Sequence, residues 1–438
     1  MKSSIPRRFP AASLDGWVYL SRHLQHQHGN FVLDFAGRLD EHRLQRAVRI
    51  AMDAEPVFGC RYVPGRKACF ERRKDLDSLT LCTVVESGDP EAELQRFVEV
   101  SSDGTQEPLL LARIVRGEND LLLLKTNHLA GDGQACKWIL SRIASFYREV
   151  GPFTPNLGCR GTRQLFREIG ARECLRLLRG PISKRAGDEW RFPSGDRANQ
   201  GELRCALRRL DASAFDRMQA YGRRFGATLN DVFLAAYFRA LWRFLDFPAG
   251  IPQSIVVPID MRRYLRSPAA QAVSNFTSTG DITLERIPDE SFEGTLSRVK
   301  QCTLTPEGRR DHALAVMLWK ILLYRFSFAK VDRDIQAASQ KNLAEGRSII
   351  GFTNMGAFEP ERFDFGVPLV EIYRMSQAVV APGLLLSVSS FQKRLTFAIE
   401  YPSRAIRQKD IERFLDTFVD EMLEPIGSEA IERSLCTL

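Results

Sequence analysis

Long apolar stretches are missing from this chain of 438 residues. The longest candidate, residues 314–328, is interrupted by Lys320 and Arg325, whereas a membrane-spanning helix needs about 20 predominantly apolar residues. Basic residues stand near the N-terminus, but no apolar segment follows them, so a secretory signal is not expected. Hydrophobic residues make up 44% of the chain and charged residues 26%, which is typical of globular proteins. The sequence therefore predicts a cytoplasmic protein.

Cysteine pairs and the common ligand motifs are missing as well. The nine cysteines are scattered, odd in number and never arranged as CxxC, which argues against a disulfide framework and a structural zinc site. The chain has no GxSxG, GxxxxGKS/T or GxGxxG segment, the signatures of serine hydrolases, P-loop enzymes and dinucleotide-binding proteins. The run His23-Leu-Gln-His26-Gln-His28 has no carboxylate or cysteine partner nearby, and we interpret it as solvated surface. We expect no bound metal.

Acidic residues are scarce in one segment. The chain carries 62 Lys and Arg against 54 Asp and Glu, a net charge of +8. Residues 160–209 alone hold thirteen basic and six acidic residues, so nearly all of the excess lies there. A nucleic-acid-binding protein would spread its basic surface over a recognisable module, and the sequence has none. Nucleic acid is therefore not an expected partner.

Hydrophobic periodicity predicts an α/β fold in two halves. In the first half, a buried strand over residues 120–127 precedes a helix over 134–149. The second half is predicted to hold helices over 212–225 and from residue 229 onward, and strands over 203–210, 254–259, 279–284, 384–390 and 395–401. We predict an N-terminal lobe over residues 1–155, a basic crossover segment over 156–201 and a C-terminal lobe over 202–438.

One segment is a candidate for catalysis. It is Thr-Asn-His-Leu-Ala-Gly-Asp-Gly over residues 126–133, where the predicted buried strand meets the predicted helix. A histidine at a strand end can project into a cleft, and glycines permit the tight turn after it. An imidazole titrates near pH ~6.5, close enough to neutrality to accept a proton from an alcohol or an amine. The aspartate can instead turn away and hold the loop through an arginine. Spacing alone favours a core histidine that is followed by a turn.

Four further segments occur in the order that one superfamily shows. They are a strand over residues 30–40 that ends in Gly-Arg-Leu-Asp, Thr-Leu-Asn-Asp within 226–236, Val-Pro-Ile-Asp-Met-Arg-Arg over 257–263 followed by Val-Ser-Asn-Phe over 273–276, and Gly-Phe-Thr-Asn-Met-Gly over 351–356. With the segment around His128, they resemble the superfamily of chloramphenicol acetyltransferase, nonribosomal peptide condensation domains and related O-acyltransferases. The resemblance covers nearly the full length. The signature HHxxxDG, or HxxxD, corresponds here to Asn127-His128-Leu-Ala-Gly-Asp132-Gly133.

The resemblance implies two similar α/β lobes, with mixed sheets and outer helices, around a central tunnel. An acyl thioester on a pantetheine arm would enter from one face and the acceptor from the other. By position, His128 would be the general base, and Asp132 would be structural and paired with Arg262. Gly133 would let the loop pass and would offer its N–H to the developing oxyanion.

Three asparagines belong to the expected site. Asn275 and Asn354 would line the tunnel, unless they only form turns. Asn127 replaces the first histidine of HHxxxDG, which places the chain nearer to the O-acyltransferase branch than to peptide-forming domains or wax ester synthases. Members of the superfamily with a single histidine are active, so this replacement does not argue against catalysis.

The resemblance implies a stand-alone acyltransferase that moves an acyl group from a thioester to a hydroxyl or an amine, without a covalent enzyme intermediate. No cofactor would be bound, and acyl-coenzyme A or an acyl-phosphopantetheine carrier would be the co-substrate. No Gly-x-Asp-Ser motif occurs, so any carrier protein would come in trans. Two alternatives stay open: an amide-forming condensation enzyme with carrier-bound substrates, and a non-catalytic binding module of the same fold. Either reaction suits the synthesis of a natural product or a lipid.

The basic segment has three open interpretations. Arg163, Arg167, Arg172, Arg176 and Arg179 recur at three to five residues with apolar residues between them, which predicts a helix with a cationic face. This face could be solvated, or it could dock an acidic acyl carrier protein or the phosphates of coenzyme A. It could also place residues 160–185 at the periphery of an anionic membrane.

Overall fold

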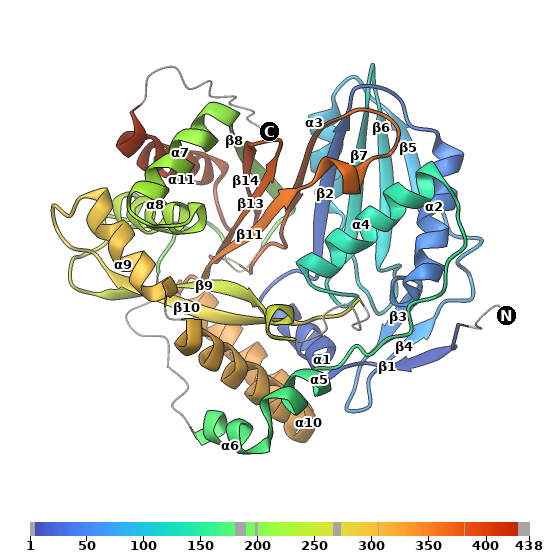
Figure 1. Cartoon of the computed structure of the whole chain (residues 1–438), viewed down its shortest axis with the longest axis horizontal. Coiled ribbons are helices and arrows are strands. Elements are labelled where there is room, and N and C mark those ends of the chain that lie inside the picture. Colours follow the sequence, from blue (N-terminus) through green and yellow to red (C-terminus); the bar gives the residue numbers. More distant parts are fainter. Residues whose placement is uncertain are drawn as a thin grey trace.

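Two lobes, each built on a mixed β-sheet with helices packed outside it, make up the computed structural model of the chain (Figure 1). The structure describes residues 5–179, 190–197, 200–265, 273–304, 306–380 and 382–427. The predicted α/β class and the two-lobed arrangement are confirmed. Among the described helices, none combines the length and the apolar character that a membrane crossing requires.

The five-stranded sheet of the N-terminal lobe has the order β12-β2-β7-β6-β5. Its strands are β2 (His28–Phe35), β5 (Cys82–Glu86), β6 (Leu110–Arg116), β7 (Asp120–Asn127) and β12 (Leu369–Met375). Only β5 and β6 are parallel neighbours within this sheet. β7 is almost wholly buried because it lies in the middle of the sheet with both faces covered, which explains its four consecutive leucines.

Helices α2 (Glu41–Ala54) and α4 (Gly133–Arg148) cover one face of this sheet, and α3 (Pro90–Glu99) packs on the other (Figure 1). α2 begins after its predicted cap, because the carboxylate of Asp40 accepts a hydrogen bond from the backbone N–H of Arg43 at 2.9 Å. A smaller sheet lies beside the lobe. Its strands are β1 (Arg8–Pro10), β3 (Cys60–Val63) and β4 (Cys69–Arg72).

The six-stranded sheet of the C-terminal lobe has the order β10-β9-β11-β13-β14-β8. Its strands are β8 (Leu203–Leu210), β9 (Pro252–Asp260), β10 (Thr277–Glu285), β11 (Ile350–Phe358), β13 (Leu384–Phe391) and β14 (Arg394–Pro402). The helices of this lobe are α7 (Ala212–Arg224), α8 (Leu229–Phe244), α9 (Phe292–Leu304) and α11 (Gln408–Leu423). α8 is largely buried and starts at a capping box of Thr228 and Asp231, as its sequence indicates.

Two strands connect the lobes. β12 comes from the C-terminal half of the chain but pairs antiparallel with β2 at the edge of the N-terminal sheet. β11 begins in the core of the C-terminal lobe at Ile350 and ends in the core of the N-terminal lobe at Phe358. The predicted division at residues 155 and 202 does not include this exchange. The site between the lobes therefore draws residues from both ends of the sequence.

Helix α10 (Pro306–Glu345) lies below both lobes and packs against α1 (Ser13–Leu20) (Figure 1). Its backbone leaves the helical region at Ser327, with φ −141° and ψ 34°. The apolar stretch of residues 314–328 lies in this helix, where Leu314 and Met317 are fully buried.

The basic crossover segment forms two short helices, α5 (Arg163–Ile169) and α6 (Ala171–Arg179), rather than the single helix that its spacing predicts. Gly170 separates them with φ +87°, a conformation that ends an α-helix. The apolar residues Leu165, Phe166, Ile169 and Leu178 pack in the cluster that includes residues of α10, whereas Leu175 is exposed. Residues 180–185 of the predicted cationic face lie outside the described residues.

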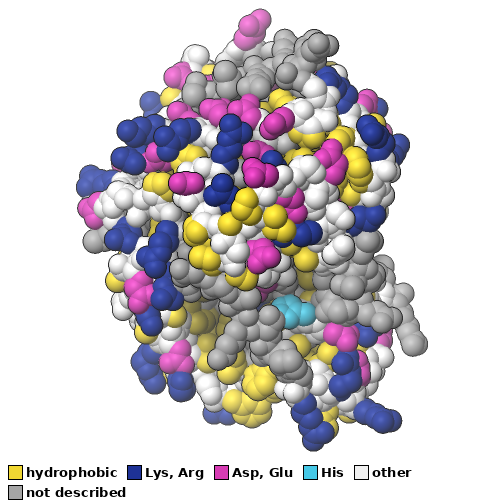
Figure 2. All heavy atoms as spheres, turned by 90° about the vertical axis from the view of Figure 1, so that its left-hand side faces the viewer, with side chains coloured by type: hydrophobic (Ala, Val, Ile, Leu, Met, Phe, Trp, Pro, Cys, Tyr) yellow, Lys and Arg dark blue, Asp and Glu magenta, His cyan; other side chains and the backbone are white. Residues whose placement is uncertain are grey.

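Several arginines of the basic stretch form ion pairs with carboxylates. These pairs are Arg160–Asp15 at 3.0 Å, Arg176–Glu173 at 2.5 Å, Arg208–Asp416 at 2.7 Å and Arg209–Glu371 at 2.9 Å. Arg163, Arg167, Arg172 and Arg179 have no ion pair within the part of the chain that the structure describes. On the face that includes α9, basic and acidic side chains are interspersed (Figure 2). The cationic surface is therefore smaller than the composition suggests.

The histidine run near the N-terminus is not solvated surface throughout. His28 lies buried in β2, and this burial holds the pKa of its imidazole well below the ordinary value. Nε2 of His23 lies 3.0 Å from a carboxylate oxygen of Asp332. Our interpretation of the run is therefore wrong for His28, because β2 is covered on both faces.

Candidate active site

His128 directly follows β7, where the chain turns towards α4. Its backbone N–H donates to the carbonyl of Gln27 at 2.6 Å, which extends the β2–β7 pairing by one residue. The side chain is half-buried. Burial, and next the positive charge of Arg374, lower the pKa of this imidazole below its ordinary value. His128 is therefore neutral at neutral pH.

Asn275 of the other lobe fixes the tautomer of this imidazole. Nδ1 of His128 lies 3.0 Å from Oδ1 of Asn275. The amide nitrogen of Asn275 donates to the carbonyl of His128 at 3.0 Å and to the carboxylate of Asp15 at 3.0 Å, and both groups are acceptors only. The amide oxygen must consequently face the imidazole. Nδ1 therefore carries the proton, and Nε2 has a free lone pair.

Asp15 and Arg160 support Asn275 from behind. Asp15 is fully buried in α1, and Arg160 donates to its carboxylate at 3.0 Å. The same guanidinium donates to the carbonyl of Ala130 at 3.0 Å and to that of Val273. Arg160 thus joins the crossover segment to the loop after His128, to the segment before Asn275 and to α1.

Asp132 turns away from His128 and joins the two lobes. Nη1 of Arg262 lies 2.9 Å from Oδ2 of Asp132, and the same oxygen accepts from Phe276 N at 2.8 Å and from Thr277 Oγ1 at 2.9 Å. Oδ1 accepts from Ala135 N at 3.1 Å and so caps α4. Burial alone would raise the pKa of Asp132, but the charge of Arg262 and these hydrogen bonds lower it. The carboxylate is ionised and fully engaged, which suits a structural role.

Gly133 begins α4 and lies directly against Arg374 of β12. A Cβ atom at this position would stand 2.8 Å from Nη1 of Arg374 and 3.1 Å from Sδ of Met355. Arg374 and Met355 are both buried, and Nη1 lies 3.5 Å from the thioether sulfur. The glycine is required here because a side chain would displace the guanidinium.

The two other asparagines have different surroundings. Asn127 is buried, donates to the carbonyl of Ser102 at 3.0 Å and accepts from Leu129 N at 3.0 Å, so it fixes the backbone around His128. Asn354 is exposed, and its side chain accepts from Gly356 N at 2.8 Å in a bulge of β11. The structure therefore brings His128, Asp132, Gly133, Arg262 and Asn275 together, whereas the hydrogen-bond partners of the Asn354 side chain among the described residues are Asn230 and Gly356.

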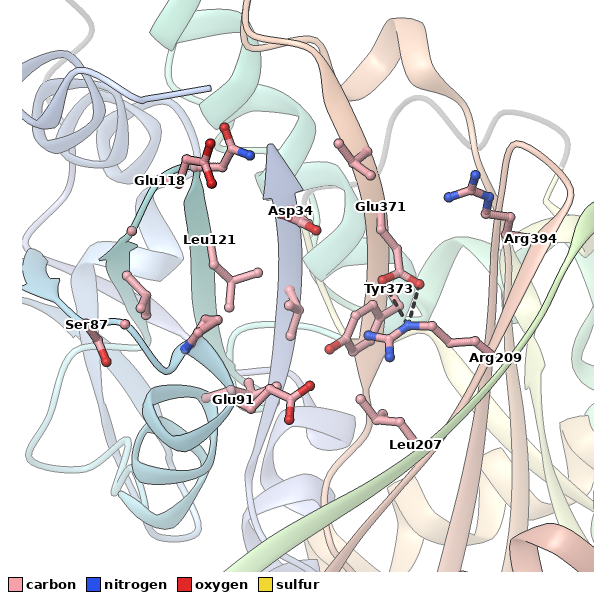
Figure 3. A pocket seen from close by; sticks show the side chains of 18 of the residues that line it. Asp34, Ser87, Glu91, Glu118, Leu121, Leu207, Arg209, Glu371, Tyr373 and Arg394 are labelled. Carbon is pink, nitrogen blue, oxygen red and sulfur yellow. Dashed lines mark hydrogen bonds and ion pairs between the residues drawn. The ribbon is translucent and has the colours of Figure 1, made fainter. Parts of the chain in front are cut away.

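Two cavities of the described structure bear on the site in different ways. One of about 850 Å³ opens between the lobes, where β2, β7, β8 and β12 meet (Figure 3). Arg209, its partner Glu371 and Tyr373 point into it, and His128 does not line it. A second cavity of about 720 Å³ lies between β1, residues 156–166 and α10. Its lining includes Phe9, Phe166 and Ile321 and reaches Val273 and Arg160, the residue that donates to the loop after His128.

No protein-family model and no curated protein matches the chain. Solved structures match over almost its whole length. Polyketide synthase associated protein 5 from Mycobacterium tuberculosis is 18% identical, with a TM-score of 0.63 over 94% of this chain and 99% of that one. The TRI3 trichothecene 15-O-acetyltransferase from Fusarium sporotrichioides is 14% identical, with a TM-score of 0.67 over 96% of both chains.

A condensation domain shows the same likeness. The first condensation domain of the calcium-dependent antibiotic synthetase is 16% identical, with a TM-score of 0.66 over 99% of this chain and 100% of that one. At such identities the likeness establishes the fold. The chain has the two-lobed fold of condensation domains and of chloramphenicol acetyltransferase-like acyltransferases, which confirms at the level of the fold the resemblance seen in the sequence.

Proposed function

We propose that the protein is an acyltransferase that moves an acyl group from a thioester to a hydroxyl or an amine, with His128 as the general base. The observation that carries this proposal is the hydrogen bond between Nδ1 of His128 and Oδ1 of Asn275. It leaves Nε2 unprotonated on an imidazole whose pKa lies below the ordinary value. A base in this state can accept a proton from an alcohol or an amine at neutral pH.

The proposed reaction is a direct displacement. Nε2 of His128 takes the proton from the acceptor as the acceptor's oxygen or nitrogen attacks the thioester carbonyl. The tetrahedral intermediate then collapses, the C–S bond breaks, and the imidazolium returns the proton to the leaving thiolate. The products are an ester or amide and a free thiol, and no oxidant, reductant or metal takes part.

An acyl-enzyme is not part of the proposal. Cys136 is the thiol nearest to the catalytic turn, but it is fully buried, and burial raises its pKa. A thiol in this state is a poor nucleophile because the thiolate is the reactive form.

The thioester is proposed to arrive on pantetheine, carried by coenzyme A or by an acyl carrier protein. The names of the matched proteins, a polyketide synthase associated protein and condensation domains, favour carrier-based chemistry. Four arginines of α5 and α6 without an ion pair among the described residues could dock an acidic carrier. The apolar cavity behind Arg160 suits a lipophilic acyl chain.

Thiol release tests the proposal. Acetyl- to palmitoyl-coenzyme A and an acylated carrier protein would each be mixed with pooled alcohols and amines, for the wild type, His128→Ala and His42→Ala. His42 is exposed on α2 and serves as the matched control. We expect release that requires an acceptor, persists in the control and falls by about 100-fold or more in His128→Ala. Unchanged turnover of His128→Ala would refute the mechanism.

The choice of acyl donor in this assay distinguishes the stand-alone acyltransferase, the condensation enzyme and the binding module. Release from free coenzyme A thioesters favours the stand-alone acyltransferase, whereas release from the carrier alone favours a condensation enzyme. Thermal stabilisation by a thioester without any thiol release would indicate a binding module.

A further inference from the structure

Arg374 of β12 is a buried cation that forms no direct ion pair among the described residues. It is 4% exposed, and among the described residues it has no carboxylate partner. Among the described residues, the hydrogen-bond acceptor of Nη1 is the weak Sδ of Met355, and Nε has no hydrogen-bond partner. The guanidinium also lies over the ring of Phe31, 5.3 Å from its centre. Burying a positive charge in such surroundings costs free energy unless an anion pairs with it.

The guanidinium faces the first turn of α4. Gly133 lies against Nη1, and Gly29 of β2 lies against Nη2, where a Cβ atom would stand 2.9 Å away. α4 is a helix of 16 residues, so its N-terminal end adds partial positive charge at the same place. Both glycines leave the guanidinium room beside His128.

The negative groups nearby do not neutralise Arg374. The carboxylate of Asp132 is already bound by Arg262, by two backbone N–H groups and by Thr277. Glu400 forms no ion pair with Arg374. Burial raises the pKa of its carboxyl to about 7, although the charges of Lys125 and Arg374 act in the opposite direction, so it balances the guanidinium only in part. Cys136 and His128 are uncharged at neutral pH. A positive field therefore remains at the end of the helix.

We propose that Arg374 and the first turn of α4 bind a carboxylate that one of the two substrates carries. This inference rests on the proposed acyl transfer, because it places the anion close to the atoms that react at His128. The phosphates of coenzyme A are excluded, since the whole pantetheine arm separates them from the thioester. A guanidinium fork matches the two oxygens of a carboxylate. Met355, with its flexible side chain, occupies this position in the free protein and is displaced when the anion binds.

The carboxylate can belong to the donor or to the acceptor, and paired probes distinguish these sources. Succinyl-coenzyme A against butyryl-coenzyme A tests the acyl chain. Leucine against leucinol tests an amine acceptor, and 3-hydroxybutyrate against 1,3-butanediol tests an alcohol. We expect the wild type to prefer the carboxylate member of one pair by about 10- to 100-fold in kcat/KM. Arg374→Met should abolish this preference, and Arg374→Lys should keep part of it.

A stability measurement separates anion binding from a structural role. Removing an uncompensated buried cation should leave the melting temperature of Arg374→Met unchanged or raise it, whereas the loss of a structural arginine would lower it. A lowered melting temperature with unchanged substrate preference would overturn the inference. Equal rates for both members of every pair in the wild type would overturn it too, while the observed turnover would still support acyl transfer.

Measurements of probe binding test the inference even if the enzyme turns over none of the probe pairs. Calorimetric titration with succinyl-coenzyme A and butyryl-coenzyme A, and with leucine and leucinol, would be run on the wild type and on Arg374→Met. A preference of about tenfold for one carboxylate probe, absent in the variant, supports the site. Equal affinities within both pairs overturn it.

Discussion

Nδ1 of His128 and Oδ1 of Asn275 lie 3.0 Å apart, so a residue of one lobe determines which nitrogen of the proposed base in the other lobe is protonated. The orientation of the amide is itself fixed, because Asp15 and the carbonyl of His128 accept from its nitrogen. The contact between the two lobes therefore also sets the protonation of the proposed base. The proposed chemistry depends on residues that do not touch the reacting atoms.

Replacing Asn275 with leucine tests this dependence. Without the acceptor, part of the imidazole population would carry its proton on Nε2 and could not act as a base. We expect kcat/KM to fall by about 10- to 100-fold, the effect of losing one hydrogen bond to a polar catalytic group. Steady-state rates with a saturating thioester would show a lower kcat and an unchanged KM. A raised KM with an unchanged kcat would instead assign Asn275 to substrate binding.

The pH dependence of the reaction provides a second test. The pKa of His128 is lowered from 6.5, first by burial and then by the charge of Arg374. Its unprotonated form is the proposed base, so kcat/KM should stay constant around neutrality and fall only at a pH below 6.5. Arg374→Met removes the positive neighbour, which should move this acidic limb to higher pH. An acidic limb above pH 6.5 in the wild type would contradict the assignment.

The pair of Asp132 and Arg262 should govern stability more than chemistry. Arg262→Met leaves a buried carboxylate without its counter-ion and should cost about 3–5 kcal/mol in the free energy of unfolding. In the double variant with Asp132→Asn, the loss should be smaller than the sum of the two single losses by about 0.5–3 kcal/mol. Urea unfolding at pH 7 measures all four proteins, and additive losses would show that the pair is not coupled.

The same pair predicts how stability responds to acid. The pKa of Asp132 in the folded protein lies below 3.8, so its contribution is complete above this value and is lost as the pH falls through the folded pKa. Arg262→Met raises the folded pKa, and its acid unfolding should begin at a higher pH than that of the wild type.

Gly133→Ala tests the close packing around Arg374. The new Cβ atom would stand 2.8 Å from Nη1 of Arg374, so the guanidinium must move. We expect a fall of about 10- to 100-fold in kcat/KM, since small displacements at a catalytic centre have large effects. Gly88→Ala is the matched control, because no atom lies within 4 Å of its Cβ position. Equal activities of the two variants would show that the position of Arg374 is unimportant.

Local patterns account for the elements that the sequence predicts well. β7 and α4 follow from an apolar strand, a cap at Asp132 and helical spacing, and these signals are complete within about thirty residues of chain. β12 is different, because it is a short edge strand whose partner β2 lies more than 300 residues away in the chain. The break at Gly170 needs a positive φ, which a glycine permits but does not require.

The residues of the candidate site also fall into two groups, those that the sequence identifies and those that it does not. His128, Asp132 and Gly133 stand in one motif, and the resemblance adds Arg262 and Asn275 by position. Asp15, Arg160 and Arg374 belong to no sequence motif, and charged residues are usually exposed to solvent. Their burial depends on contacts between distant segments, such as the 260 residues that separate Asp15 from Asn275. Only the folded chain could identify them.

Cys136 offers the last test, because a direct displacement needs no enzyme thiol. The side chain lies in the first turn of α4, and burial raises the pKa of its thiol, so hardly any thiolate exists at neutral pH. Cys136→Ala should keep full transfer activity, with a stability loss of about 1 kcal/mol for the small cavity. Mass spectrometry after incubation with an acyl thioester should find no acyl group on Cys136, and the exposed Cys159 reports non-specific acylation. An acylated Cys136 that transfers its group to added acceptor would establish a covalent mechanism and refute direct attack.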